Sequence, residues 1–420
     1  MAENLIRTYA TDKEKEHLTE KTLFTALLDA ALHLFDPAAE ATVYQDLDRP
    51  LAHYWVRTVR GGASLDAMRS AVLAGTRCVE LRLRAQEGTL DRARDLLAML
   101  RDVAFTTTSL PLLLVLDVHA SEEDQNRLAE AVKTTLGPLL ADMPLVRDAD
   151  AHLPSPMSLA GRVVVLGTAG VTAESCLALV HMRHGDLKRD NARWKNYGEL
   201  GFADAMGSER KRNGMARFSR NQLCRLYPDD DRIGSSNMDP VPGFCLGVQL
   251  CAMDPEIADE AAWLNAGLFR DNGAQGFVLK GRIPHVTDGK VRKPEKGERV
   301  TVSIIASHGL AADAAFAYVS VAVTGVAGDH SVHRTRAVKS ARDICSWDEE
   351  FSFPISSPSL ALLSFQVRDR DATSPQQILG QAVGRYPLVR PGIHGVQLFN
   401  AGGEPLPGRL LVRIATFPVI

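Results

Sequence analysis

Cysteine and histidine are the side chains in this sequence best suited to zinc binding or redox chemistry. The six cysteines are scattered, and none forms a Cys-X-X-Cys pair or a zinc-spaced cluster with histidine. We therefore expect reduced, buried thiols in a cytosolic protein. Four histidines, His119, His181, His184 and His308, are isolated in the sequence, and we expect surface or packing roles for them.

The elements that would position such residues fall into two kinds. Residues 20–35 predict an amphipathic helix that ends at Asp36. From about residue 50, apolar segments at 78–83, 112–118 and 162–166 alternate with helical patterns at 91–103 and 124–140. Such alternation predicts a parallel sheet covered by helices, either a barrel or a doubly wound sheet.

The rhythm changes twice further along the chain. Residues 168–215 are polar without a clear period, which is typical of a linker, and short strands resume at 247–253 and 276–280. Residues 283–298 resemble a hinge. Segments such as VTVSIIA, AYVSVAV and LALLSFQVRD then alternate with turn signals to the end, which predicts an antiparallel β-sandwich.

Composition limits the classes of protein that remain. The 420 residues are 45% hydrophobic and 24% charged, with a formal net charge of −3, so two or three soluble folded units are expected. Nothing in this balance indicates nucleic-acid binding. No apolar run reaches the roughly 20 residues of a membrane helix, and the N-terminal residues lack a secretory signal pattern.

Several segments resemble one known family when taken in order. They are VYQDLDRPLAHYW, AGTRCVELRL, LPSPMSLAGRVVVLG, RFSRNQLCRLYPDDDRIGSSNMDP, GFCLGVQLCAMD, NGAQGFVLK and SFQVRDRDATSPQQILGQ. Their order and spacing resemble the eukaryotic phosphoinositide-specific phospholipases C of the delta type.

The resemblance implies a TIM-like (β/α)8 barrel split into X and Y halves and followed by an antiparallel C2 β-sandwich. A short EF-hand-like helical remnant would precede the barrel. The implied boundaries are 1–42 for the remnant, 43–167 for the X half, 168–215 for the X–Y linker, 216–282 for the Y half, 283–298 for the hinge and 299–420 for the C2 sandwich.

The implied reaction cleaves phosphatidylinositol bisphosphate into diacylglycerol and inositol trisphosphate. In such enzymes a calcium ion activates the attacking hydroxyl, and two histidines act as general acid and base. Here Arg60 stands where the first histidine is expected, and no histidine lies between His53 and Asp117. The loop expected to carry the second histidine is absent after Arg84.

The implied calcium site is incomplete. Glu80 and Asp117 match acidic ligands, whereas Gly61 stands where an asparagine ligand is expected and Arg82 where an aspartate is expected. We therefore expect calcium, if it binds, to meet a degenerate site. In the sandwich, Asp369 and Asp371 match part of a C2 calcium loop, although an aspartate-rich surface turn is the favoured interpretation.

The implied headgroup pocket is mixed. Arg225 and Tyr227 match residues that contact the inositol phosphate, and a packing pair on a barrel strand is the alternative. Two expected lysines are replaced at about Leu166 and Thr168. Arg60 and Arg82 could hold a phosphate in place of calcium, whereas drift, or a salt bridge from Arg82 to the nearby acids, is the simpler interpretation.

Three functional interpretations follow. The first is a non-catalytic lipid-binding or scaffold protein of phosphoinositide signalling, cytoplasmic or peripheral on phosphoinositide-containing membranes, with protein partners and without nucleic acid. The alternative is an active calcium-dependent phospholipase C. A defective gene product comes last, because the absent loops lie at a barrel mouth, where deletion is tolerated.

Overall fold

The computed structural model describes residues 33–143, 145, 152–185, 194–229, 236–283, 285–287, 290–292, 295–310, 316–339, 344–370 and 378–419. These form two compact units. One unit comprises residues 43–257 and 272–292, and the other contains residues up to 42, 258–271 and 293–420. Residues 1–32 of the expected EF-hand remnant lie outside the described residues. Its remaining residues, 33–42, contain the short helix α4 (Pro37–Ala41).

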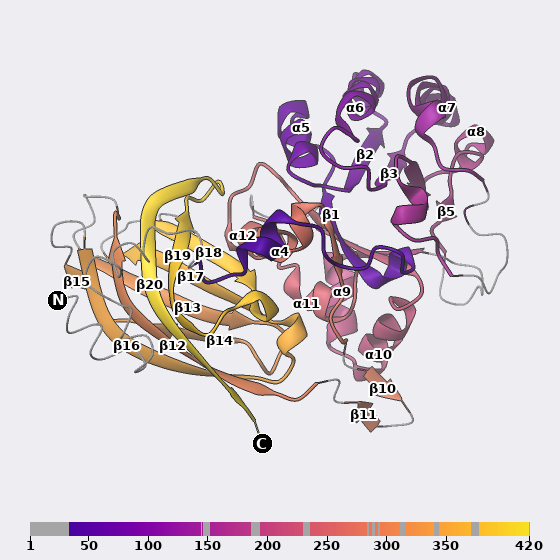
Figure 1. The fold of residues 1–420 in the computed structure, drawn as a ribbon. Coiled ribbons are helices and arrows are strands. Elements are labelled where there is room, and N and C mark those ends of the chain that lie inside the picture. The colour runs from indigo at the N-terminus through magenta and orange to yellow at the C-terminus, as the bar shows by residue number, and fades with distance from the viewer. Residues whose placement is uncertain are drawn as a thin grey trace. The chain divides into compact units, whose positions relative to one another are not determined.

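The first unit is a parallel barrel, as the resemblance implies (Figure 1). In the described part of the chain its sheet has the order β5-β4-β3-β2-β1-β8-β7-β6 with all neighbours parallel, and a parallel bridge from His184 to Trp194 links β5 to β6. A ninth strand, β9 (Phe277–Leu279), pairs antiparallel with β1. The barrel strands are β1 (Tyr54–Val59), β2 (Cys78–Arg84), β3 (Leu112–His119), β4 (Val163–Gly167), β5 (Met182–Arg183), β6 (Trp194–Gly198), β7 (Leu223–Tyr227) and β8 (Leu250–Met253).

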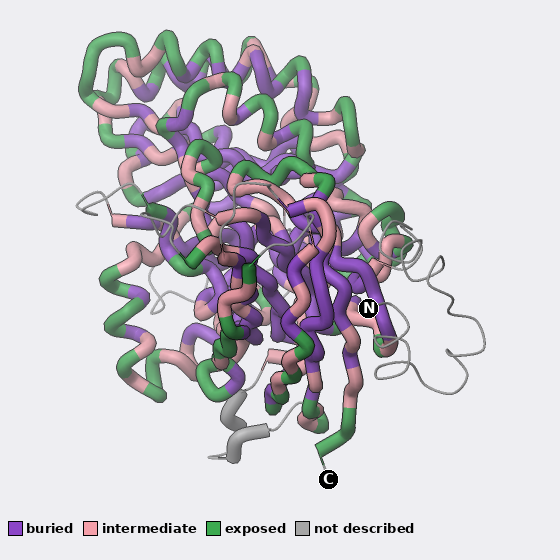
Figure 2. The backbone as a smooth tube through the Cα atoms, turned by 90° about the vertical axis from the view of Figure 1, so that its left-hand side faces the viewer, coloured by how far each residue is buried: buried purple, intermediate pink, exposed green. Residues whose placement is uncertain are grey.

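Helices cover the outside of the first three strands. α5 (Leu65–Leu73) follows β1, α6 (Thr89–Val103) follows β2, and α7 (Glu122–Leu136) follows β3. Alternate residues of β2 and β3 pack outward against the apolar faces of these helices in one continuous core. The helix surfaces that face away from the strands are exposed (Figure 2).

The other residues of each strand point into the barrel. A second buried cluster fills the half of the barrel nearer the amino ends of the strands, and it includes Cys78, Leu113, Val115, Leu223 and Leu250. A polar layer replaces this apolar filling nearer the carboxyl ends of the strands, where active sites of such barrels are found.

Residues 168–215, where the sequence predicts a linker, contain regular structure. They include β5, β6, α8 (Glu174–Leu177) and α9 (Glu199–Met206), and α10 (Glu209–Phe218) begins there. α9 buries only Phe202 and Ala205, and α10 only Met215 and Ala216. Such narrow buried faces leave too few apolar positions for a helical period to be visible in the sequence.

The second unit is an antiparallel β-sandwich, as the turn pattern predicts. Its strand order is β14-β13-β17-β18-β19-β20-β12-β16, with β15 paired to β13, and one apolar cluster forms its core. The strands are β12 (Glu298–His308), β13 (Phe316–Thr324), β14 (Ser331–Arg334), β15 (Val338–Lys339), β16 (Ile344–Ile355), β17 (Leu362–Asp369), β18 (Gly380–Arg385), β19 (Gly392–Phe399) and β20 (Pro405–Pro418).

A helix from the end of the barrel sequence also belongs to this unit. α12 (Glu260–Phe269) packs against β18 so closely that a Cβ on Gly267 would lie 2.5 Å from Val383 Cγ1. Asp271, just beyond the helix, forms a buried ion pair with Arg385 of β18.

The region expected to be a hinge, 283–298, contains a two-stranded hairpin of β10 (His285–Thr287) and β11 (Lys290–Arg292). Among the described residues, the helices are too short or too polar to cross a membrane.

Candidate functional site

The polar layer of the barrel begins on β2. Glu80, Arg82 and Arg84 alternate along this strand and therefore share the face that points into the barrel. In the parallel register of β2 and β3, Arg82 lies opposite Asp117 and Arg84 opposite His119. The pairing thus brings five ionisable side chains of two strands to the carboxyl end of the barrel.

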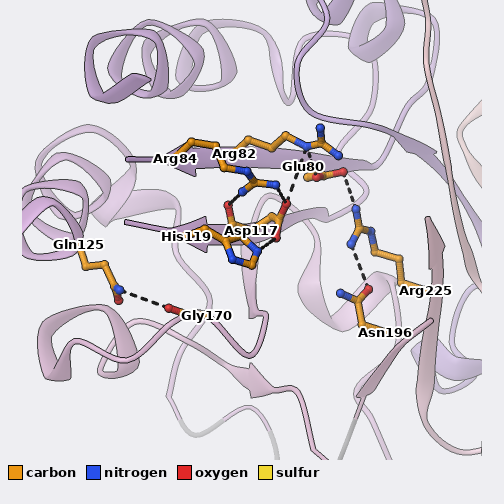
Figure 3. A network of polar contacts seen from close by, with 9 residues as sticks. All are labelled: Glu80, Arg82, Arg84, Asp117, His119, Gln125, Gly170, Asn196 and Arg225. Carbon is orange, nitrogen blue, oxygen red and sulfur yellow. Dashed lines mark hydrogen bonds and ion pairs between the residues drawn. The ribbon is translucent and has the colours of Figure 1, made fainter. Parts of the chain in front are cut away.

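Glu80 is held between two arginines (Figure 3). Its side chain is fully buried; Arg82 Nε lies 2.6 Å from Oε1, and Arg225 donates to Oε2. Burial by itself raises the pKa of Glu80, but the charges of Arg225 and Arg82 and a hydrogen bond from the Gly61 N–H outweigh burial and hold the pKa well below its ordinary value. Glu80 is therefore ionised and internally neutralised.

Asp117 has its own set of nitrogen partners. Arg84 Nη2 lies 2.8 Å from Asp117 Oδ2, and Arg82 Nε is 3.7 Å from the same oxygen. His119 Nε2 lies 3.4 Å from Oδ1. Both carboxylate oxygens consequently face nitrogen atoms of neighbouring side chains (Figure 3).

Arg225, predicted to touch a headgroup, is 1% exposed and joins this cluster through its ion pair with Glu80. Besides Glu80 it donates to Asn196 Oδ1 at 3.0 Å, in the register that β6 and β7 impose. Its guanidinium carbon lies 4.9 Å from the centre of the Tyr227 ring. Both residues thus contact other groups of the barrel, and their predicted role in headgroup binding stays a prediction.

Arg60 and Gly61 lie at the end of β1. The Arg60 N–H donates to the Met253 carbonyl at 2.7 Å, which fixes the backbone there. A Cβ built on Gly61 would lie 2.7 Å from Arg82 Cγ and 2.8 Å from the Glu80 carbonyl oxygen. The side chain of Arg82 therefore runs through the space that any side chain at position 61 would need.

The residues present do not fit a calcium ion. Calcium requires six to eight oxygen ligands, whereas all four carboxylate oxygens of Glu80 and Asp117 face nitrogen. A divalent ion roughly 4 Å from the Arg82 charge would be repelled by about 8 kcal/mol at an effective dielectric constant of 20. Within the described residues, no group of three or more acidic, histidine or cysteine side chains is placed to hold a metal.

The proposed C2 calcium loop is described in part. Asp369 ends β17 and pairs with Ala317 of β13, whereas Asp371 lies outside the described residues. Arginines flank Asp369 on both sides, and Arg370 lies over the Phe316 ring, 4.2 Å from its centre. The prediction of a partial calcium site in this loop stays a prediction.

Three contributors to the cluster were not identified from the sequence. Arg84 could have been found from the period of two that it shares with Glu80 and Arg82 on a strand. His119 could have been found from its i, i+2 spacing to Asp117. Asn196 gives no signal, because its strand lies in the range where the sequence predicts a linker.

Comparisons with known proteins agree with this architecture. Residues 47–168 match the family model of the phosphatidylinositol-specific phospholipase C X domain, residues 180–283 match that of the Y domain, and residues 298–388 match the C2 domain. The crystal structure of L. pealei PLC21 superposes with a TM-score of 0.85 at 19% identity, over 100% of this chain and 62% of that one, which shows a shared fold.

Curated relatives include proteins whose names differ on activity. The chain is 26% identical over 509 aligned positions to 1-phosphatidylinositol 4,5-bisphosphate phosphodiesterase delta-1 of Rattus norvegicus, covering 99% of this chain and 67% of the relative. It is also 26% identical over 484 positions to Inactive phospholipase C-like protein 1 of Homo sapiens, covering 96% and 44%. This chain thus spans about two thirds of the first protein and less than half of the second.

Proposed function

Because the chain belongs to the phosphoinositide-specific phospholipase C family, we propose that it is a non-catalytic member that binds anionic phosphoinositide headgroups. The observation that carries this proposal is the position of Arg82, whose guanidinium lies against both acidic residues that match calcium ligands. We further propose a cytoplasmic protein that acts peripherally on phosphoinositide-containing membranes, together with protein partners of signalling.

The missing proton-transfer groups support the loss of catalysis. Arg60 is in place of one expected histidine, and β2 runs from Arg84 through a four-residue connection into α6, which removes the loop of the other. An arginine stays protonated and cannot serve as a general base at neutral pH. Loss of one such group typically costs about 10²–10⁴ in rate.

The charge of the cluster supports phosphate binding. Three guanidinium groups, those of Arg82, Arg84 and Arg225, face the two carboxylates of Glu80 and Asp117, which leaves one positive charge in excess. The side chains of Arg82 and Arg84 are 20% and 27% exposed, so they can reach a ligand. Arginine matches phosphate geometry through two parallel hydrogen bonds.

The test combines hydrolysis and binding on the full chain. We expect no inositol phosphate release from phosphatidylinositol bisphosphate micelles with calcium. We expect binding to vesicles containing that lipid, weakened about tenfold by Arg84→Gln and unchanged by Arg101→Gln, an exposed arginine on α6 paired with Asp102. Release above background would contradict the non-catalytic proposal, and equal binding by both variants would contradict headgroup binding at this cluster.

An active enzyme remains the second candidate, and one observation favours it. His119 is 61% exposed and lies 3.4 Å from Asp117, so a histidine and an acid are adjacent at the barrel mouth. If hydrolysis is measured, this candidate predicts that His119→Ala abolishes it. Hydrolysis that survives in this variant would exclude His119 as the base.

A further inference from the structure

The acidic pair of the barrel is satisfied from within the protein. One carboxylate oxygen of Glu80 faces Arg82 and the other faces Arg225. The oxygens of Asp117 face His119 and Arg84 in the same way. Buried carboxylates without such partners would be strongly unfavourable. The acids thus act as counter-charges for arginines rather than as open ligands.

The path of the Arg82 side chain depends on its neighbour. Gly61 lies against Arg82 Cγ and Cδ, where an added Cβ would approach to 2.7 and 3.2 Å. The second contact of that Cβ, 2.8 Å to the Glu80 carbonyl oxygen, is with backbone that cannot swing aside. Glycine at 61 is therefore required by the position of Arg82 and by the Glu80 carbonyl oxygen.

We propose that Arg82 is a built-in cation that takes the place of a divalent metal in this cluster, and that Gly61 is the residue that makes room for it. The two positions form one unit: a side chain at 61 displaces Arg82, and Arg82 excludes metal from Glu80 and Asp117. The cluster is permanently charged, and ligand binding to it is independent of calcium. This inference deepens the proposed function, and it rests on that function only for the identity of the ligand.

The test replaces Gly61 and Arg82 by residues whose side chains carry oxygen atoms. Gly61→Asn with Arg82→Asp supplies two new oxygen ligands beside Glu80 and Asp117. All proteins carry Asp369→Asn and Asp371→Asn, which removes any contribution of the sandwich loop. Calcium binding is measured by isothermal titration calorimetry on the full chain, and folding is checked by circular dichroism and the melting temperature in calcium and in chelator.

We expect no binding by the parent protein and one binding event in the double variant, with a melting temperature that rises with calcium. Arg101→Asp, which changes the charge equally at an exposed site on α6, should gain no binding. Calcium binding by the parent that is lost in Asp117→Asn would overturn the proposal. So would a double variant that melts cooperatively, keeps its circular dichroism and binds no calcium.

The outcome is separable from that of the proposed function. Phosphatidylinositol bisphosphate vesicles should bind the parent protein equally in calcium and in chelator. Hydrolysis by a parent that binds no calcium would refute the non-catalytic proposal and leave the built-in cation standing. Calcium binding at Asp117 without hydrolysis would refute the built-in cation and leave the non-catalytic proposal standing.

Discussion

Replacing Glu80 by glutamine tests how strongly the buried cluster stabilises the barrel. Glu80 is 0% and Arg225 1% exposed, so Glu80→Gln removes the negative charge that neutralises a buried guanidinium, whose other contacts are the neutral Asn196 oxygen at 3.0 Å and the Tyr227 ring. Breaking a buried pair by removing one partner costs about 3–5 kcal/mol. Of the roughly 5–15 kcal/mol that stabilise a typical domain, this is a large share.

Hydrogen exchange followed by mass spectrometry measures this loss strand by strand. We expect amides of β2 and β7 to exchange about 100- to 4,000-fold faster in Glu80→Gln, because each 1.4 kcal/mol is a factor of ten in the opening equilibrium. Amides of β17, in the sandwich unit, should be unchanged. Glu349→Gln, which breaks an exposed pair with Arg336 on the sandwich, is the matched control and should cost at most about 1 kcal/mol.

A change below about threefold in β2 and β7 would refute this reasoning. It would mean that the buried guanidinium finds water or another acceptor, and that the ion pair is neutral in stability. A double-mutant cycle of Glu80→Gln, Arg225→Gln and their combination then measures the coupling energy of the pair. A small coupling energy indicates a weak ion pair, whereas a large one indicates that another contact compensates for its loss.

Three further predictions concern separate parts of the molecule. Arg77→Leu should destabilise the barrel by about 3 kcal/mol in urea unfolding. The reason is that the fully buried guanidinium donates to the carbonyls of Val72 and Ala104 at the ends of two helices. An unchanged urea midpoint would contradict this capping role. Gly61→Ala should lower the melting temperature, because the added Cβ meets the Arg82 stem and the Glu80 carbonyl oxygen. Adding Arg82→Ala should restore only part of the loss, because it relieves only the first contact, and a silent Gly61→Ala would contradict the steric argument. Burial lowers the pKa of His33 to about 4, so between about pH 6.5 and pH 4 the unfolded chain binds more protons than the folded one. The free energy of unfolding of the sandwich should therefore fall by up to roughly 3 kcal/mol over this range. His33→Gln should flatten that part of the stability profile, and a profile unchanged by it would show that other groups cause the loss.

The architecture could be predicted because it repeats simple patterns. Apolar segments such as 112–118 alternate with amphipathic helices such as 91–103, and the observed β3 and α6 differ from these bounds by one or two residues. The choice between a barrel and a doubly wound sheet came from the resemblance, because both arrangements have the same local pattern. β6 was not predicted, because a short polar strand that pairs with β7 in a closed ring has no apolar signature of its own.

The sequence by itself determined which groups are present: arginine at 60 and 82, glycine at 61, acids at 80 and 117, and no histidine between 53 and 117. These identities were sufficient to predict a damaged calcium site. They left three alternatives for Arg82 open, namely phosphate binding, drift and a salt bridge.

The tertiary structure decided among the contacts. Parallel register sets Arg82 opposite Asp117, and the closed ring brings Arg225 of β7 to Glu80 of β2, 145 residues away in sequence. The salt bridge from Arg82 to Glu80 forms, and Arg225 is buried in an ion pair with the same carboxylate. The physical reason is that ion pairing depends on distances of a few ångströms between side chains, and those distances exist only after strands far apart in the chain have closed into one barrel.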